Sequence, residues 1–388
     1  MVQIIAGINP KILKWARESA GQTVMDVAAA FQKRPEVIEE WESGKAAPTY
    51  VQLEKLAYQL YKRPLALFFF PEVPSDPEPL RSFRTLPREE LDAFSPDTRL
   101  ALRQATAMQL ALYELNEGPN PSPRNIFRTL RISAQTPVTQ AGSRVRDYLS
   151  VPVNTQVRWH GASEALKNWR TQLQECGVFV FKRPLAQADI SGFALLDDEY
   201  PVIYLNNSSP QTRQVFSLFH ELGHVLLGAN GVTKQDQSYI ARLDPKNKGI
   251  EEFCNRFAAE ILVPSEDFSA YHEGDFYNDS YVKQLADRYS VSREVILRRA
   301  LDRHLVAAEY YETKAKEWAQ RAEHARQMKK GGNYYLNQVT YLGSKFLQLA
   351  FGRYYQGRCT REELADYLNV KAKSVAGLEP YAVGHEGG

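Results

Sequence analysis

The stretch Pro210-Gln-Thr-Arg-Gln-Val-Phe-Ser-Leu-Phe-His-Glu-Leu-Gly-His-Val-Leu-Leu-Gly228 predicts a buried helix at the centre of its domain. Apolar residues occupy nearly every side of this helix, which is typical of a helix surrounded by protein. Ser209 is a suitable N-cap, Pro210 suits the first helical position and Gly228 can end the helix.

The same helix carries the pattern HExxH, formed by His220, Glu221 and His224. The two histidines lie one turn apart on one face, so both imidazoles can bind a single Zn²⁺ ion. Zinc lowers the pKa of a bound water to about 7, and Glu221 is placed to accept its proton as the water attacks a carbonyl group. Because three ionisable groups in an apolar helix need partners, a metal site is favoured over a pair of core histidines.

Two histidines leave zinc short of a protein ligand, so a third should follow downstream. The pattern HExxHxxGxxH is excluded, because Leu227 and Asn230 occupy its last two positions. We therefore expect a glutamate on a second helix, within residues 250–264. Glu251 is the first choice, since Asn255 lies one turn later and can orient a zinc-binding histidine. Glu252 points about 100° away and stays the alternative.

Three segments together resemble the ImmA/IrrE family of zinc peptidases: Ile203-Tyr-Leu-Asn206, the HExxH pattern, and Glu251-Glu-Phe-Cys-Asn255-Arg-Phe-Ala-Ala-Glu-Ile-Leu-Val-Pro264. The resemblance covers about residues 160–300. It implies a zincin-like α+β fold, zinc bound by His220, His224 and Glu251, and Glu221 as the catalytic base. It also implies a protein substrate, typically a transcriptional repressor or a partner in a stress, mobile-element or toxin–antitoxin system. At Gly228 the sequence departs from relatives that often carry a further histidine.

Residues 1–70 predict a separate helical domain. The order helix, helix, Trp41-Glu-Ser-Gly44-Lys-Ala-Ala-Pro48, helix resembles the XRE-type, phage repressor-like helix-turn-helix domain. That resemblance implies DNA contacts around a recognition helix at residues 35–43, through Lys33, Arg34 and Lys45. Four glutamates in this helix (Glu36, Glu39, Glu40 and Glu42) would oppose phosphates. Protein contact or homodimer formation is therefore the alternative use of this domain.

The remaining domain boundaries follow from composition. Residues 71–95 are rich in proline and predict a linker. Residues 96–305 predict a helical lead-in and the peptidase domain, with strands at 177–181, 192–196 and 201–205, the last two as a hairpin. Residues 306–388 predict a charged helix at 309–330, an amphipathic helix at 341–355 and a capped helix at 360–368. The expected fold class is mostly helical α+β.

Bulk properties fit a globular cytoplasmic protein. The chain has 388 residues, 44% hydrophobic and 24% charged, with a net charge of +2 that argues neither for nor against nucleic acid. The three cysteines, Cys176, Cys254 and Cys359, are widely spaced and odd in number, which suits a reducing compartment. We expect no signal peptide and no membrane span.

Two functions from different classes remain. The first is a zinc endopeptidase that cleaves a regulatory protein. The second is a DNA-binding regulator or antitoxin, in which the zinc domain is a sensor or a scaffold for a partner. The presence of Glu221 favours the enzyme, because a zinc scaffold has no need of a base. Zinc is the chemical default, since HExxH sites accept several divalent ions. Four residues are candidates for stabilising an oxyanion, and none is assigned: His160, His272, Tyr204 and Tyr271.

Overall fold

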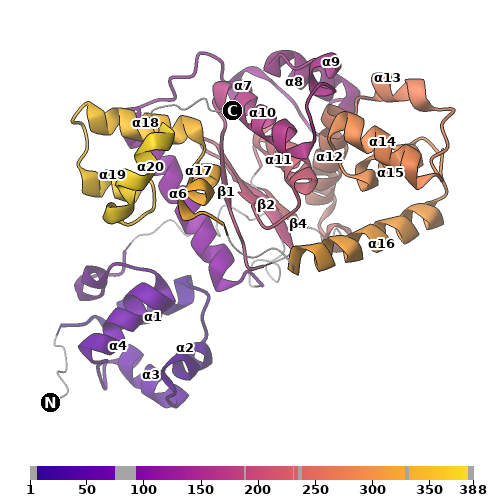
Figure 1. Cartoon of the computed structure of the whole chain (residues 1–388). Helices are drawn as coiled ribbons and strands as arrows, with labels where there is room; N and C mark the ends of the chain where they lie inside the picture. The colour runs from indigo at the N-terminus through magenta and orange to yellow at the C-terminus, as the bar shows by residue number, and fades with distance from the viewer. Residues whose placement is uncertain are drawn as a thin grey trace. The chain divides into compact units, whose positions relative to one another are not determined.

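The computed structural model describes residues 7–74, 93–187, 189–229, 231–234, 238–327 and 332–382. The chain forms two compact units, Met1–Gln104 and Ala105–Gly388, and the division falls within helix α6 (Pro96–Leu115). Figure 1 labels their helices and strands. Among the described residues, none of the helices combines the length and apolar character needed to cross a membrane.

The first unit packs short helices around one apolar core. Its core contains Ile12, Val27, Trp41 and Leu53. Thr23 and Thr49 each form a capping box, as a threonine followed three residues later by an acid or amide predicts. The elements are α1 (Pro10–Ser19), α2 (Val24–Phe31), α3 (Pro35–Ser43), α4 (Tyr50–Glu54), the π-helix η1 (Lys55–Tyr61) and the 3₁₀-helix η2 (Leu65–Phe69).

A buried ion pair joins α1 to α3. Arg17 donates from Nε and Nη2 to the two carboxylate oxygens of Glu42, at 2.7 and 3.0 Å. Both side chains are about nine-tenths buried. One of the four glutamates of α3 is therefore withdrawn from the surface, whereas Glu36, Glu39 and Glu40 are exposed.

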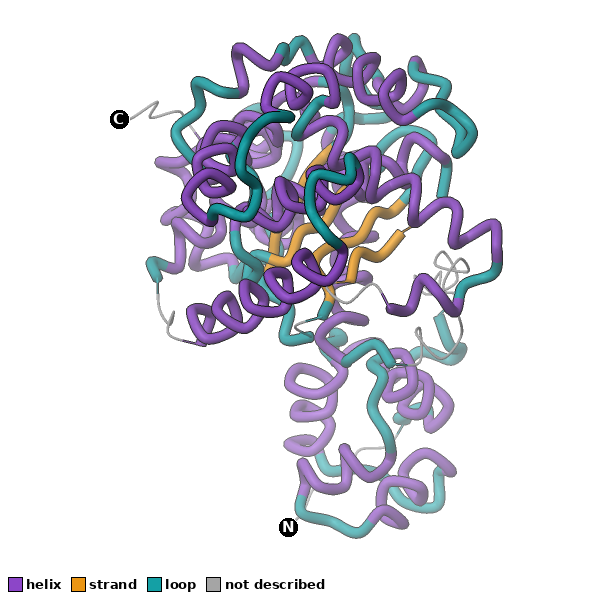
Figure 2. Tube along the Cα trace, turned by 90° about the vertical axis from the view of Figure 1, so that its right-hand side faces the viewer, coloured by secondary structure: helices purple, strands orange, loops and turns teal. Residues whose placement is uncertain are grey.

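The second unit is built on a four-stranded sheet with strand order β1-β3-β2-β4 among the described residues. Figure 2 shows its strands at the centre of the unit with helices around them. β2 (Ile190–Leu195) and β3 (Val202–Asn206) pair antiparallel, β1 (Phe179–Arg183) runs parallel to β3, and β4 (Gly231–Lys234) pairs antiparallel with β2. The predicted mostly helical α+β fold is confirmed.

Helix α11 (Gln211–Leu227) carries the HExxH pattern across one face of the sheet. It is preceded by α10 (Ala162–Glu175), whose Trp169 ring packs edge-on against Phe219 at 4.8 Å between centroids. The helix begins one residue later than predicted, with Pro210 as its N-cap, so the proposed capping by the Ser209 side chain was wrong. It ends as expected at Gly228, which adopts a φ of 67° that favours glycine.

Helix α12 (Pro245–Leu262) packs directly on α11 (Figure 1). It begins earlier than the predicted 250, because Asp244 caps it by accepting from the backbone N–H groups of Lys246 and Asn247. The two helices approach closely at Gly223: a Cβ atom there would lie 2.9 Å from the Cys254 sulfur.

The remaining helices surround this core. The predicted helix at 341–355 is corrected to two helices, since Gly343, at φ 85° and ψ 150°, ends the first of them. Arg170 of α10 links β1 to the end of the first of these two helices by donating to the carbonyl groups of Val180 and Thr340, each at 2.8 Å. The other helices are α7 (Ile126–Thr129), α8 (Val138–Leu149), α9 (Val153–Gln156), α13 (Ser265–Phe268), α14 (Asp279–Tyr289), α15 (Arg293–Asp302), α16 (Ala308–Gln327), α17 (Tyr334–Leu342), α18 (Ser344–Tyr355), α19 (Arg361–Tyr367) and α20 (Val375–Ala382), with 3₁₀-turns η4 (Ser238–Arg242), η5 (Ser269–Tyr271) and η6 (Ala372–Ser374).

Candidate metal centre

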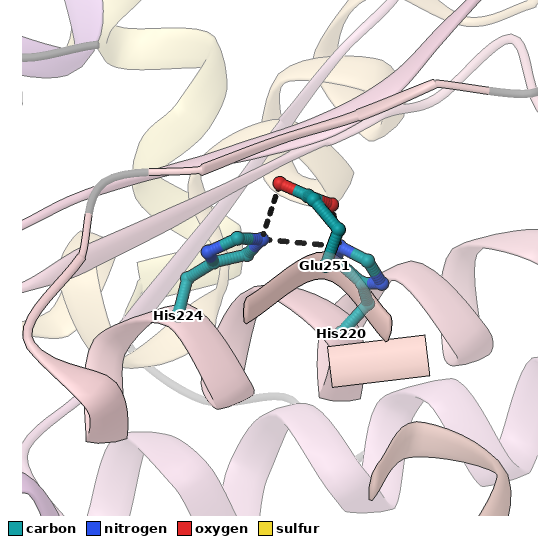
Figure 3. Close-up of side chains that lie close together, drawn as sticks. All are labelled: His220, His224 and Glu251. Atoms are coloured by element: carbon teal, nitrogen blue, oxygen red, sulfur yellow. Dashed lines mark hydrogen bonds and ion pairs between the residues drawn. The ribbon is translucent and has the colours of Figure 1, made fainter. Parts of the chain in front are cut away.

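His220, His224 and Glu251 converge at the contact between α11 and α12, as Figure 3 shows. The Nε2 atoms of the two histidines are 3.1 Å apart. Glu251 places Oε2 3.2 Å from Nε2 of His220 and Oε1 3.4 Å from Nε2 of His224. All three side chains are buried, with exposed fractions of 1%, 1% and 3%.

These separations fit a tetrahedral zinc ion. Zinc bonds of 2.0–2.2 Å to nitrogen and oxygen place neighbouring ligand atoms of a tetrahedron about 3.4 Å apart. The three ligand-atom separations, 3.1, 3.2 and 3.4 Å, are close to that value. Two imidazoles and a carboxylate are also the donor set of catalytic zinc sites that keep a fourth position open.

The electrostatics of the cluster favour a cation at its centre. Burial by itself would raise the pKa of Glu251, but the two imidazoles hold that pKa well below its ordinary value. Burial would likewise lower the pKa of His224, yet the neighbouring Cys254 and Glu251 raise it well above the ordinary value. A buried carboxylate of this kind requires positive charge beside it, which a divalent cation supplies while both histidines stay neutral.

Each member of the cluster touches another side chain that can orient it. His220 donates from Nδ1 to Oδ1 of Asn255 at 2.9 Å once its Nε2 is committed to a metal. Tyr239 of η4 donates its hydroxyl to Oε2 of Glu251 at 3.0 Å. Cys254 lies beside His224 and is fully buried, which raises the pKa of its thiol.

Glu221 lies beside the cluster beneath strand β2. Its side chain has no exposed surface, and a Cβ atom at Gly192 would lie 3.8 Å from its Cγ. The nearest neighbour of that Cβ atom would be the Tyr204 carbonyl oxygen at 2.9 Å, so the glycine accommodates the adjacent strand β3, and its contact with Glu221 is of ordinary van der Waals length. Glu221 is also near enough to Tyr239 and Cys254 for its charge to help raise their pKa values, after the larger effect of burial.

Residues 173–301 match the model of the IrrE N-terminal-like domain, Peptidase_M78. The matched segment runs from the end of α10 to α15 and contains all three residues of the cluster. This match supports a zinc-dependent metallopeptidase. No curated protein matches the chain.

The structure also shows where the other candidate residues lie. Glu252 is exposed on α12, 3.9 Å from the Lys248 ammonium group, and does not join the cluster. His160 and His272 are also exposed, and both bond to nearby backbone carbonyl groups. Tyr204 is stacked on Phe193 within the sheet. The residues proposed to contact DNA, all in the first unit, are exposed: Lys33, Arg34 and Lys45.

Sequence reasoning missed Tyr239 and the contact of Cys254 with His224. Tyr239 lies in a short 3₁₀-turn without a periodic pattern, so nothing local marks it. Cys254 is three residues from Glu251 and thus near the predicted site, but a lone cysteine in an apolar helix is more often a packing residue.

Proposed function

We propose that this protein is a cytoplasmic zinc-dependent endopeptidase, with His220, His224 and Glu251 as the metal ligands. The observation that carries the proposal is the buried triangle of ligand atoms with edges of 3.1–3.4 Å beside the carboxylate of Glu221. A bound zinc ion acts as a Lewis acid that polarises a carbonyl group and makes water more acidic. The match to a peptidase family over the same residues supports hydrolysis of an amide bond.

The chain's own residues supply the rest of the chemistry. Glu221 accepts the proton of the attacking water and holds it for the departing amine. Asn255 keeps the proton of His220 on Nδ1, so that Nε2 offers its lone pair to the metal. The closely packed helices α11 and α12 fix the ligands before substrate arrives, which reduces reorganisation during the reaction.

An edge strand of the sheet favours a peptide substrate. β4 pairs with β2 on one side, and no described strand pairs with its other side. An extended segment of another protein can add to such an edge through main-chain hydrogen bonds. By resemblance to ImmA/IrrE proteins, we propose a regulatory protein as substrate, such as a transcriptional repressor in a stress, mobile-element or toxin–antitoxin system.

The test compares wild type with Glu221→Gln in cleavage of a repressor encoded beside the gene, followed by mass spectrometry of the fragments. We expect one cleavage in the wild type and a loss of about 10²-fold or more in the variant, with zinc retained. Glu252→Gln is the matched control, because it makes the same change at an exposed carboxylate on α12. Cleavage by Glu221→Gln at the wild-type rate would refute the assigned role.

A second proposed function is DNA binding by residues 1–70. The observation that favours it is the ion pair between Arg17 and Glu42, which neutralises the charge of Glu42. Lys33 and Arg34 are exposed just before α3. The three exposed glutamates limit this binding, so we expect it to be weak and sensitive to salt. Glu221→Gln should leave DNA binding unchanged while it abolishes cleavage, so this variant distinguishes a regulator from a peptidase. Nanomolar, sequence-specific binding in physiological salt would contradict the expectation.

A further inference from the structure

Tyr239 contacts the metal-ligand cluster from outside helices α11 and α12. It lies in η4, between β4 and α12, and its side chain is 3% exposed. Its hydroxyl donates to Oε2 of Glu251 at 3.0 Å and lies 3.5 Å from the carbonyl oxygen of Val232. The shorter of the two contacts is a hydrogen bond to a charged acceptor, which is the stronger kind.

The carboxylate of Glu251 needs such a contact. Its two oxygens face different histidines, Oε2 toward His220 and Oε1 toward His224. With both Nε2 atoms committed to a metal, neither imidazole presents a hydrogen to these oxygens. The terminal torsion of a glutamate has a broad energy profile, so the plane of the carboxylate is weakly fixed by its own rotamer. A hydroxyl anchored on another element can fix it.

We propose that Tyr239 is a positioning residue that holds the Glu251 carboxylate in the orientation required for metal binding. The inference rests on the metal centre of the proposed function and adds a residue to it. Asn255 performs the corresponding task for His220 from within α12. Tyr239 acts from a separate turn, so the position of η4 is linked to the geometry of the site.

The test is zinc affinity, measured by competition with a chromophoric chelator on the full chain. Side chains that orient metal ligands change affinity by 10–100-fold, and we expect Tyr239→Phe to weaken zinc binding within that range. Tyr200→Phe is the matched control, because Tyr200 is equally buried in the same unit and donates to the carbonyl group of Gly118 at 2.9 Å. It should bind zinc as the wild type does.

A second background separates positioning from a general loss of structure. In Glu251→Ala, no side-chain oxygen is left to accept the hydrogen bond from Tyr239, so adding Tyr239→Phe should change zinc affinity less than about twofold. Equal weakening in both backgrounds would show that the hydroxyl supports the fold instead, and would overturn the proposal. So would wild-type affinity in Tyr239→Phe. A wild-type chain that binds no zinc would instead remove the metal centre, and with it both proposals.

Discussion

Replacing Gly223 by alanine tests the close packing of α11 on α12 that brings the ligands together. The added methyl carbon would lie 2.9 Å from the Cys254 sulfur and 3.2 Å from Cδ1 of Phe257. Favourable contacts between such atoms occur at about 3.5–4.0 Å, so the helices must separate by roughly 0.5 Å. Overpacking of this kind costs about 1–3 kcal/mol, whereas alanine gains about 1 kcal/mol over glycine inside a helix. The expected net loss of unfolding free energy is about 0–2 kcal/mol.

The effect on the metal should be larger than the effect on stability. Zinc sites tolerate deviations of about 0.2 Å in ligand distance, and Glu251 moves with α12. We therefore expect Gly223→Ala to weaken zinc binding by about tenfold or more, measured by chelator competition, with urea unfolding of the metal-free protein as the stability assay. Removing the sulfur in Gly223→Ala/Cys254→Ala should restore part of the affinity.

The control is Gly352→Ala in α18, where a Cβ atom meets nothing within 4 Å. The unfolding free energy of this variant should rise by up to about 1 kcal/mol, and its zinc affinity should equal that of the wild type. If Gly223→Ala behaved in the same way, gaining stability and keeping wild-type zinc affinity, the described packing of α11 on α12 would be refuted.

Two further predictions concern stability away from the metal. Burial, and to a smaller extent Arg170, lowers the pKa of Lys182 to about 7. Between pH 7 and about 10.5 the unfolded chain therefore binds more protons than the folded chain, and the unfolding free energy rises with pH. The loss of unfolding free energy caused by burying Lys182 is largest below pH 7 and disappears as the pH approaches about 10.5. Lys182→Met should raise the unfolding free energy at pH 6 by up to about 4 kcal/mol and by little at pH 10, and an equal gain at both pH values in urea unfolding would contradict this. Glu42→Ala should destabilise the first unit by up to about 3–5 kcal/mol, because Arg17 would stay buried with only Glu18, at 3.5 Å, as an ion-pair partner. Glu39→Ala at the surface should change the unfolding free energy by less than about 0.5 kcal/mol in the same urea assay.

The parts of the structure that sequence could predict are those set by short-range rules. The spacing of His220 and His224 places them on one helix face whatever the rest of the fold does, and the capping box at Thr360 depends on residues three apart. Glu251 required one tertiary assumption, that a second helix supplies the third ligand. The structure brings it to the histidines.

What escaped prediction depends on contacts between distant segments. Tyr239 meets Glu251 only after the turn following β4 has folded against α12. β4 itself contains glycine, threonine and lysine among its four residues and becomes a strand because β2 offers it a partner. Gly343 looked compatible with a continuous helix, yet a Cβ atom there would lie 2.6 Å from the Arg170 guanidinium group, which binds the end of α17.

The central claim is a single zinc ion held by His220, His224 and Glu251, and the metal content of the purified chain tests it most directly. Plasma mass spectrometry of the wild type and of His220→Ala should find one equivalent of zinc per chain in the first and nearly none in the second. A wild type without zinc after preparation free of chelators, or a variant that keeps a full equivalent, would contradict the account.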